Sequence, residues 1–470
     1  MLFKASQDKE KMENSLVRKV LDSKGQVHIV TGELGRGGQG IVYKTIDPNV
    51  IIKMLVSELG LPTTDDKVRY TYEEKINRVK VIPFPKQVNL ATPVDTLAPP
   101  HIGYTMQMLT GMVPLEKDMK QKEGSLLRNY LNTGGLKRRL LILKKLSSIL
   151  AYLQMNNLVY GDLSPNNVFV SSAFDQSEVW LIDPDNICDQ LDFSHSVQTP
   201  GYSSPEVYSG AMPNTIYSDV YSFAILAYEL LTARHPFEGD RVVNGGGWED
   251  EGHDCYDLAY KGEIPWVGDL EDNSNPPIPG VGIPHEWVIS PVMFDLFGKT
   301  FSYEGRKKPL TRPAMLEWHK CLSRAVKMVV TCEGCGSTYF LSNNCPFCDT
   351  NRKQVFFTTI KSLIKDEFDG NLWKTIETLV LDGLETGGKD TIKISSFVPR
   401  LAHEQDTDVV ELFIKNDRLM VRNILRSNNL YVKVDDKYKN FSFEAFGRSG
   451  TISLAYRGES EFRYLTIDRV

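Results

Sequence analysis

The chain has 470 residues, of which 41% are hydrophobic and 24% are charged, and its formal net charge is −6. This composition excludes a disordered or fibrous chain and, at roughly 100–200 residues per domain, predicts several folded units. The acidic balance provides no basic field for DNA, RNA or anionic lipid, so nucleic acid is not an expected partner. No run reaches the roughly 18 apolar residues of a membrane helix, and the polar residues 4–14 exclude a signal peptide. We therefore expect a cytoplasmic protein.

Short β-type runs come first along the chain, at residues 26–30, 41–43 and 50–52. Turns separate these runs, which predicts an antiparallel meander. Apolar residues then recur at helical spacing, at Val68, Tyr72, Ile76 and Val79. This spacing predicts a helix over about residues 64–81 that follows the meander.

Two more helices are expected farther along, at about residues 136–154 and 218–231. Proline and glycine crowd residues 245–285, which predicts a long loop-rich insertion. Residues 353–383 are expected to be helical. Residues 393–470 contain several β-type runs and predict a small β-sandwich.

A glycine-rich run with the pattern GxGxxG lies between the first two β-type runs. Because glycines lack side chains, backbone N–H groups there can approach phosphate oxygens. A dinucleotide-binding fold needs a helix directly after the glycines, but β-branched residues and a Pro-Asn turn follow here, which favours a glycine loop between two strands. A plain glycine-rich hairpin is the alternative. The candidate nucleotide-binding residues are Leu34, Gly35, Gly37, Gly38, Gly40 and Val42.

Lys53 ends an otherwise apolar β-type run, where an ammonium group is costly to bury without a counter-charge. ATP phosphates and a carboxylate of the following helix would supply that charge. The helix offers Glu73 and Glu74, and we prefer Glu73 because Tyr72 and Ile76 put it nearer the apolar face. A surface lysine is the alternative interpretation.

Two segments give the strongest indication of function. Residues 158–170 read LVYGDLSPNNVFV, and residues 179–185 read VWLIDPD. They resemble the catalytic loop HRDxxxxN and the metal loop DFG of eukaryotic-like (Hanks-type) serine/threonine protein kinases. The resemblance spans about residues 25–325. The sequences of the glycine-rich run and the catalytic loop are similar to those of bacterial kinases of stress- and tellurite-resistance gene clusters. Further similar stretches follow in order at residues 199–206, 218–223 and 312–313.

The resemblance implies an α+β bilobal kinase fold that transfers the γ-phosphoryl group of ATP to Ser or Thr. The protein then mainly positions groups and neutralises charge. By the same resemblance, Asp162 accepts the proton of the substrate hydroxyl, and Asn167 and Asp183 hold Mg²⁺. Lys53 binds the α- and β-phosphates, with Glu73 as its partner. The implied partners are ATP and a protein substrate.

The chain departs from the family pattern around the catalytic aspartate. The usual His and Arg are Tyr160 and Gly161, and the Lys two residues beyond the aspartate is Ser164. Loss of the Lys removes a positive charge beside the transferred group, which predicts slow turnover and blurs the choice between Ser/Thr and Tyr substrates. Without the Arg, no buried cation awaits a phosphate on the activation loop, so phosphorylation of Ser194 or Ser196 is not expected to be required.

Four of the seven cysteines form two CxxC pairs separated by nine residues. Each pair presents two thiolates from one tight turn, and two such pairs close a tetrahedral site that suits Zn²⁺. Because all four positions are filled, we expect a structural zinc ribbon rather than a catalytic centre. Four unrelated free thiols are the alternative. The predicted ligands are Cys332, Cys335, Cys345 and Cys348.

The sequence therefore predicts a kinase domain over residues 1–328, with lobes at about 25–113 and 114–328. A zinc ribbon over 329–352 and a β-rich domain over 353–470 follow it. The expected function is an ATP-dependent kinase acting on itself or on a partner protein. The rival is a pseudokinase adaptor that binds nucleotide and recruits partners through its ribbon and C-terminal domain.

Overall fold

The computed structural model describes residues 19–37, 40–57, 61–120, 125–192, 197–245, 254–352, 355–366, 370–381, 389–393, 408–415, 418–424, 428–434, 437–441, 444–446, 452–457 and 462–469. The chain divides into two compact units. The first unit comprises residues 1–129, 141–283 and 292–319. The second comprises residues 130–140, 284–291 and 320–470.

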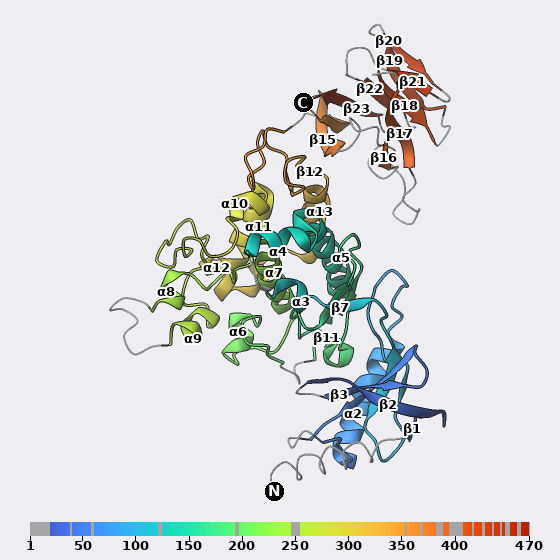
Figure 1. Ribbon diagram of the computed structural model, residues 1–470, viewed down its shortest axis with the longest axis vertical. Coiled ribbons are helices and arrows are strands. Elements are labelled where there is room, and N and C mark those ends of the chain that lie inside the picture. Colours follow the sequence, from blue (N-terminus) through green and yellow to red (C-terminus); the bar gives the residue numbers. More distant parts are fainter. Residues whose placement is uncertain are drawn as a thin grey trace. The chain divides into compact units, whose positions relative to one another are not determined.

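The first unit begins with an antiparallel sheet of strand order β1-β2-β3-β4-β6-β5 (Figure 1). Its strands are β1 (Lys19–Leu21), β2 (Val27–Gly37), β3 (Gly40–Thr45), β4 (Val50–Leu55), β5 (Asp95–Thr96) and β6 (Gly103–Gln107). Strands β2, β3 and β4 pair with one another in sequence order. The predicted meander is thus confirmed.

Helix α2 (Asp66–Val81) corresponds to the helix predicted at 64–81. It begins after Asp65, whose carboxylate accepts a hydrogen bond from the N–H of Lys67 at 2.8 Å, an N-cap that satisfies a free amide of the first turn. The helix buries Tyr72, Ile76 and Val79. In the same buried cluster, the residues from the sheet and the segment leading into β6 are Ile51, Ile102, Tyr104 and Met106.

The middle of the chain is mainly helical, and the boundary between the two units crosses it. The helices predicted at 136–154 and 218–231 are confirmed as α5 (Gly135–Met155) and α7 (Ile216–Thr232). Among the described helices, none is both long enough and apolar enough to cross a bilayer. The other helices are α3 (Glu116–Met119), α4 (Leu126–Asn132), η1 (Pro184–Asn186), α6 (Pro205–Tyr208), α8 (Asp240–Val243), α9 (Cys255–Tyr260), α10 (His285–Val288), α11 (Pro291–Phe301), α12 (Tyr303–Lys307), η3 (Pro309–Thr311) and α13 (Met315–Val326).

Short strands accompany these helices. They form a three-stranded sheet β10-β9-β7 and a two-stranded sheet β11-β8. These pairings place the residues that follow β8 and β10, which include the two segments with kinase-like sequence. The strands are β7 (Met112–Pro114), β8 (Leu158–Val159), β9 (Val168–Ser171), β10 (Val179–Leu181) and β11 (Cys188–Asp189).

Residues 353–383 were predicted to be helical, and that prediction is wrong. They contain the antiparallel strands β14 (Phe356–Asp366) and β15 (Gly370–Leu381). Along β14 the buried side chains alternate, at Thr358, Ile360 and Ser362. Strand β14 also pairs with β23 (Phe462–Arg469) near the end of the chain. The local pattern of a short apolar run fits either a helix or a strand. The pairing with β23 makes this run a strand.

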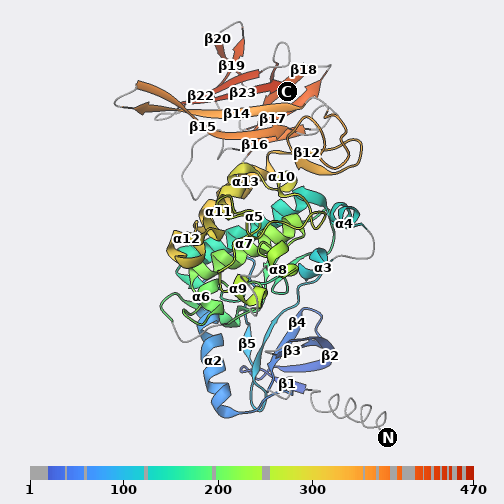
Figure 2. The same ribbon diagram turned by 90° about the vertical axis from the view of Figure 1, so that its left-hand side faces the viewer.

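The second unit contains the predicted β-sandwich, drawn as stacked layers of arrows in Figure 2. One sheet has the order β15-β14-β23-β22-β19-β20, and the other has the order β16-β17-β18-β21. A single buried cluster draws on both sheets, for example through Ile360, Leu412, Val421 and Leu454. The remaining strands are β12 (Val329–Thr331), β13 (Thr338–Phe340), β16 (Lys389–Lys393), β17 (Asp408–Lys415), β18 (Arg418–Asn423), β19 (Leu430–Val434), β20 (Lys437–Asn440), β21 (Glu444–Phe446) and β22 (Ile452–Arg457).

Candidate active site and metal centre

Lys53 on β4 is a buried cation that lies between two carboxylates. Its side chain is 3% exposed, and its ammonium nitrogen lies 2.8 Å from both Asp183 Oδ1 and Asp185 Oδ2. Burial by itself lowers the pKa of Lys53, but the charges of Asp185 and Asp183 outweigh burial, and the pKa is raised. The ammonium therefore stays charged, and the counter-charge that the sequence called for comes from the metal loop.

The predicted pairing of Lys53 with Glu73 is not found. Glu73 instead accepts a hydrogen bond from Nη1 of Arg69, one helical turn earlier, at 3.2 Å. The α2 residue that reaches the carboxylates beside Lys53 is Tyr72, whose hydroxyl donates to Asp185 at 2.6 Å. The helical periodicity places Tyr72 on the apolar face of the helix. Periodicity alone does not show which group the tyrosine hydroxyl will bond.

Asp185 is the site residue that sequence reasoning missed. It is 2% exposed, and the hydroxyls of Tyr72 and Tyr104 donate to its two oxygens at 2.6 Å each. Burial raises the pKa of Asp185, but the charge of Lys53 and these hydrogen bonds outweigh burial, and the pKa is lowered. The sequence did contain a signal: an aspartate stands at position 185, where the DFG pattern has a glycine.

Asp183 precedes the short helix η1 and is the more accessible carboxylate of the pair. Its backbone is left-handed, with a φ of +53°, and its side chain is 26% exposed. Burial raises the pKa of Asp183, and the attraction of Lys53 offsets this rise only in part because Asp185 and Asp162 add negative charge. Two carboxylates sharing one ammonium leave an excess negative charge, which fits a hard divalent cation such as Mg²⁺.

Asp162 is held in a fixed orientation by its neighbours. Asn167 Nδ2 donates to its backbone oxygen and to its Oδ2, each at 2.9 Å. Thr199 Oγ1 donates to its Oδ1 at 2.5 Å. Because the amide nitrogen of Asn167 is used on Asp162, its amide oxygen is the atom left to serve as a cation ligand.

A buried carboxylate supports the loop around Asp162. Asp219 on α7 accepts hydrogen bonds from the backbone N–H groups of Tyr160 at 2.6 Å and Gly161 at 2.9 Å. Burial raises the pKa of Asp219 to about 7, although the two amides favour its charged form. The hydroxyl of Tyr160 donates to the carbonyl oxygen of Ile182, next to the metal loop. The unusual Tyr160 therefore links the catalytic loop to the metal loop.

The segment that ends at Glu206 is anchored by a buried ion pair. Arg312 donates to both carboxylate oxygens of Glu206, at 2.7 and 2.8 Å, and its guanidinium lies 4.7 Å from the ring centroid of Tyr221. The two charged side chains are only 0% and 9% exposed. Ser194 and Ser196, whose phosphorylation is not expected to be required, lie outside the described residues.

The glycine-rich run includes the end of β2 and the start of β3, where Gly37 pairs with Gly40. Packing requires glycine at position 40, because a Cβ there would lie 2.7 Å from the carbonyl oxygen of Met54. Gly35 and Gly37 have open space where a Cβ would stand, so their backbone is accessible to a ligand. Of the other predicted residues, Leu34 is exposed on β2, Val42 is half-buried on β3, and Gly38 lies outside the described residues.

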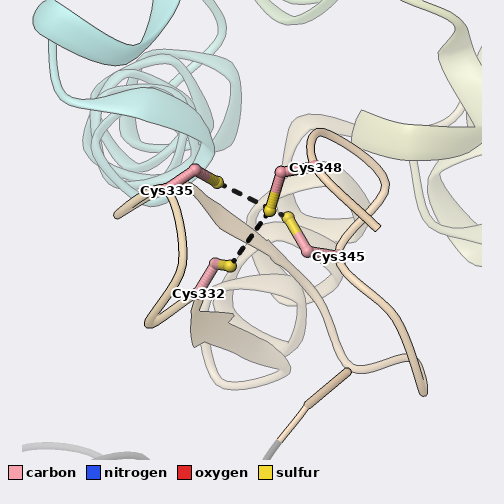
Figure 3. A group of neighbouring side chains, drawn as sticks. All are labelled: Cys332, Cys335, Cys345 and Cys348. Carbon is pink, nitrogen blue, oxygen red and sulfur yellow. Dashed lines mark hydrogen bonds between the residues drawn. The ribbon is translucent and has the colours of Figure 1, made fainter. Parts of the chain in front are cut away.

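The four paired cysteines lie together in the second unit and point toward one another (Figure 3). Their sulfur atoms all lie within 4.8 Å of one another. The Sγ–Sγ distance is 3.5 Å between Cys332 and Cys348 and 3.8 Å between Cys335 and Cys345. Zn–S bonds of about 2.3 Å in a tetrahedron place sulfurs at about this separation, so the four thiols fit Zn²⁺.

The two cysteine turns have matching hydrogen bonds. Cys335 Sγ lies 2.7 Å from Ser337 Oγ, and Cys348 Sγ lies 3.1 Å from Thr350 Oγ1, two residues later in each turn. Hydrogen bonds from the Thr350 hydroxyl and amide lower the pKa of Cys348 to about 6. The thiolate, the form that binds a metal, is thus favoured at Cys348, whereas burial raises the pKa of Cys345 to about 12.

The ribbon contacts the two early segments that belong to the same unit. The ring of Phe347 lies 6.3 Å from that of Tyr130 and 5.6 Å from that of Trp287, between centroids. Thr338 Oγ1 accepts a hydrogen bond from the N–H of Lys137 at 2.9 Å, in the first turn of α5. This side-chain oxygen from a distant strand takes the part of an N-cap.

Comparison with known proteins identifies the domain that holds Lys53 and Asp183. Residues 29–250 match the family model described as "Protein kinase domain". Serine/threonine-protein kinase pkn2 of Myxococcus xanthus is 34% identical over 131 residues, which cover 26% of this chain and 16% of that protein. Serine/threonine-protein kinase PrkC of Bacillus subtilis is 29% identical over 132 residues, covering 27% and 20%.

A third relative is aligned over a longer stretch. Myosin light chain kinase A of Dictyostelium discoideum is 28% identical over 221 residues, which cover 45% of this chain and 68% of that protein. The matches to the two bacterial relatives thus span a fifth or less of their lengths. Together these matches identify a protein kinase fold, and the two bacterial relatives are serine/threonine-protein kinases.

Proposed function

From a protein kinase domain of the serine/threonine class, we propose that this chain transfers the γ-phosphoryl group of ATP to Ser or Thr of itself or of a partner protein. The observation that carries the proposal is the meeting of Lys53 with Asp183, beside an Asp162 that Asn167 and Thr199 orient. A scaffold that only binds partners has no need for these groups in this arrangement.

Each group has a defined part in the proposed transfer. The carboxylate of Asp162 orients the substrate hydroxyl and accepts its proton, and its two hydrogen-bonded oxygens keep it from rotating. Asp183 and Asn167 would hold Mg²⁺, which neutralises charge on the phosphates when bound. Lys53 contributes a charged ammonium for the α- and β-phosphates.

For the second unit we propose one structural Zn²⁺ bound by Cys332, Cys335, Cys345 and Cys348. With four thiolate ligands the ion has no open position for substrate, so it supports folding rather than chemistry. All seven cysteines are free thiols in the structure, which suits a reducing compartment, and we propose the cytoplasm. The bacterial pkn2 and PrkC relatives favour a bacterial kinase.

The test is transfer of label from γ-labelled ATP with Mg²⁺ to Ser or Thr of the protein itself or of a generic basic protein. The parent protein should label, and Asp162→Asn should lower the rate by about a hundredfold or more because the oriented base is lost. The matched control is Asp189→Asn, because Asp189 is an exposed aspartate that follows the metal loop in the sequence. No label from parent protein that binds ATP would favour the pseudokinase alternative.

A further inference from the structure

Neither of the α2 carboxylates that the sequence offers as partners of Lys53 is bound to it in the structure. Glu73 is bound by Arg69 at 3.2 Å and is one-third exposed, and Glu74 is exposed. A kinase that lacks a helix carboxylate beside its lysine needs another way to hold the ammonium in place, because a long flexible side chain is otherwise free to rotate.

Asp185 provides that hold from within the metal loop. Its Oδ2 accepts from both Lys53 at 2.8 Å and Tyr72 at 2.6 Å, and its Oδ1 accepts from Tyr104 at 2.6 Å. The two tyrosine rings lie nearly parallel, with centroids 6.5 Å apart and planes at 23°. Three donors from β4, α2 and β6 therefore converge on one buried carboxylate, and none of its hydrogen bonds competes with water.

The two aspartates of the loop differ in exposure. The side chain of Asp183 is 26% exposed, whereas that of Asp185 is 3% exposed. An exposed carboxylate can exchange its partners for a cation, but a carboxylate that is fully paired and buried cannot do so without losing those bonds. Asp183 is thus suited to Mg²⁺, and Asp185 is suited to a permanent ion pair.

This inference rests on the proposed function. We propose that Asp185 is the positioning residue that holds Lys53 for ATP binding, the role that the sequence assigned to Glu73. Tyr72 then joins α2 to the active site through a hydrogen bond to Asp185 rather than through an ion pair with Lys53. Asp185 also balances the charge of Lys53, so that Asp183 remains available to a cation.

The first experiment measures ATP affinity by calorimetry without Mg²⁺, together with kcat and KM for ATP with Mg²⁺. Asp185→Asn should weaken ATP binding and raise KM by about thirtyfold or more, as for one partner removed from a buried charge pair. Tyr72→Phe should weaken binding about three- to tenfold, since one hydrogen bond to a charged group is lost. The matched control Asp189→Asn should keep the parent's ATP affinity and KM.

Glu73→Gln separates this inference from the expectation drawn from sequence. If Asp185 positions Lys53, Glu73→Gln keeps the ATP affinity within about twofold of the parent's, a change no larger than that of an exposed ion pair. Loss of ATP affinity in Glu73→Gln, with parent-like values in Asp185→Asn, would overturn the inference.

Thermal unfolding of a double-mutant cycle covers the case in which Asp185→Asn folds poorly. Lys53→Met should lower the melting temperature, and adding Asp185→Asn to Lys53→Met should raise it again because one unpaired buried charge is removed. Simple additivity of the two changes would contradict the inference. If the parent protein transfers no phosphate, the proposed function fails, but ATP affinity and this cycle still decide the role of Asp185.

Discussion

The carboxylates around Lys53 and the thiols of the ribbon are two clusters of negative groups held in different ways. In the first unit, Asp185 is neutralised by an ammonium and two tyrosine hydroxyls from three separate elements. In the second unit, the thiols contact one another, the hydroxyls of Ser337 and Thr350, and nearby backbone amides. In the first cluster the buried Asp185 is paired within the protein and the excess charge is left on the more exposed Asp183, whereas the second cluster depends on a cation.

This difference separates two uses of charge. A cluster whose buried charges are paired without a metal keeps its shape while Mg²⁺ and nucleotide come and go, which a catalytic site requires. A cluster that is incomplete without a metal makes folding depend on that metal, as in small zinc domains. The four predictions that follow test the contrast, from the largest expected effect to the smallest.

Removing the internal cation should damage the first cluster most. Lys53→Met should reduce phosphoryl transfer by about a hundredfold or more and lower the free energy of unfolding by about 3–5 kcal/mol, because two carboxylates lose their counter-ion. Labelling with γ-labelled ATP and urea denaturation measure the two effects. The exposed Lys44→Met on β3 is the control, and parent-like activity and stability in Lys53→Met would remove the basis of the comparison.

Removing one thiolate should damage the second cluster and spare the first. Cys345→Ser should reduce bound zinc from about one per chain, and hydrogen exchange in residues 329–352 should accelerate by about tenfold or more as local opening becomes easier. ATP affinity should stay at the parent's value, since the Lys53 site needs no zinc. Cys188→Ser, outside the cluster, should retain its zinc. Full zinc content in Cys345→Ser would exclude the four-thiolate site.

A smaller effect is expected where the ribbon meets α5. Thr338→Val removes the hydroxyl that accepts from the N–H of Lys137, and loss of such a cap costs about 1 kcal/mol. Urea denaturation should detect this loss. Thr71→Val is the control, because its hydroxyl bonds only within α2. Equal stabilities for the two variants would mean that the Thr338 contact contributes nothing to α5.

The smallest effect is expected from Ser194→Ala combined with Ser196→Ala. With Gly161 where the family has an arginine, the catalytic loop offers no cation at that position for an added phosphate. Activity in the labelling assay should therefore stay within a few-fold of the parent's. A hundredfold loss that acidic replacements restore would show that a third charged cluster, created by phosphorylation, controls the enzyme.

The local parts of the site could be predicted from the sequence. The glycine run and the four cysteines depend on residues a few positions apart, and their spacing reflects the chemistry directly. The Asp162–Asn167 loop was recognised by its resemblance to the catalytic loop of protein kinases. Strands β2–β4 and helices α2, α5 and α7 were predictable for the same reason, because each has a clear hydrophobic period.

Only the tertiary structure decided which partners meet across long sequence distances. Lys53 and Asp185 lie 132 positions apart in the sequence, and Tyr72 reaches them from a helix where periodicity marked it only as apolar. The strand identity of residues 356–366 depends on pairing with residues 462–469. Such pairings depend on which buried groups find a matching charge, donor or backbone edge, and no short stretch of sequence contains both members of the pair.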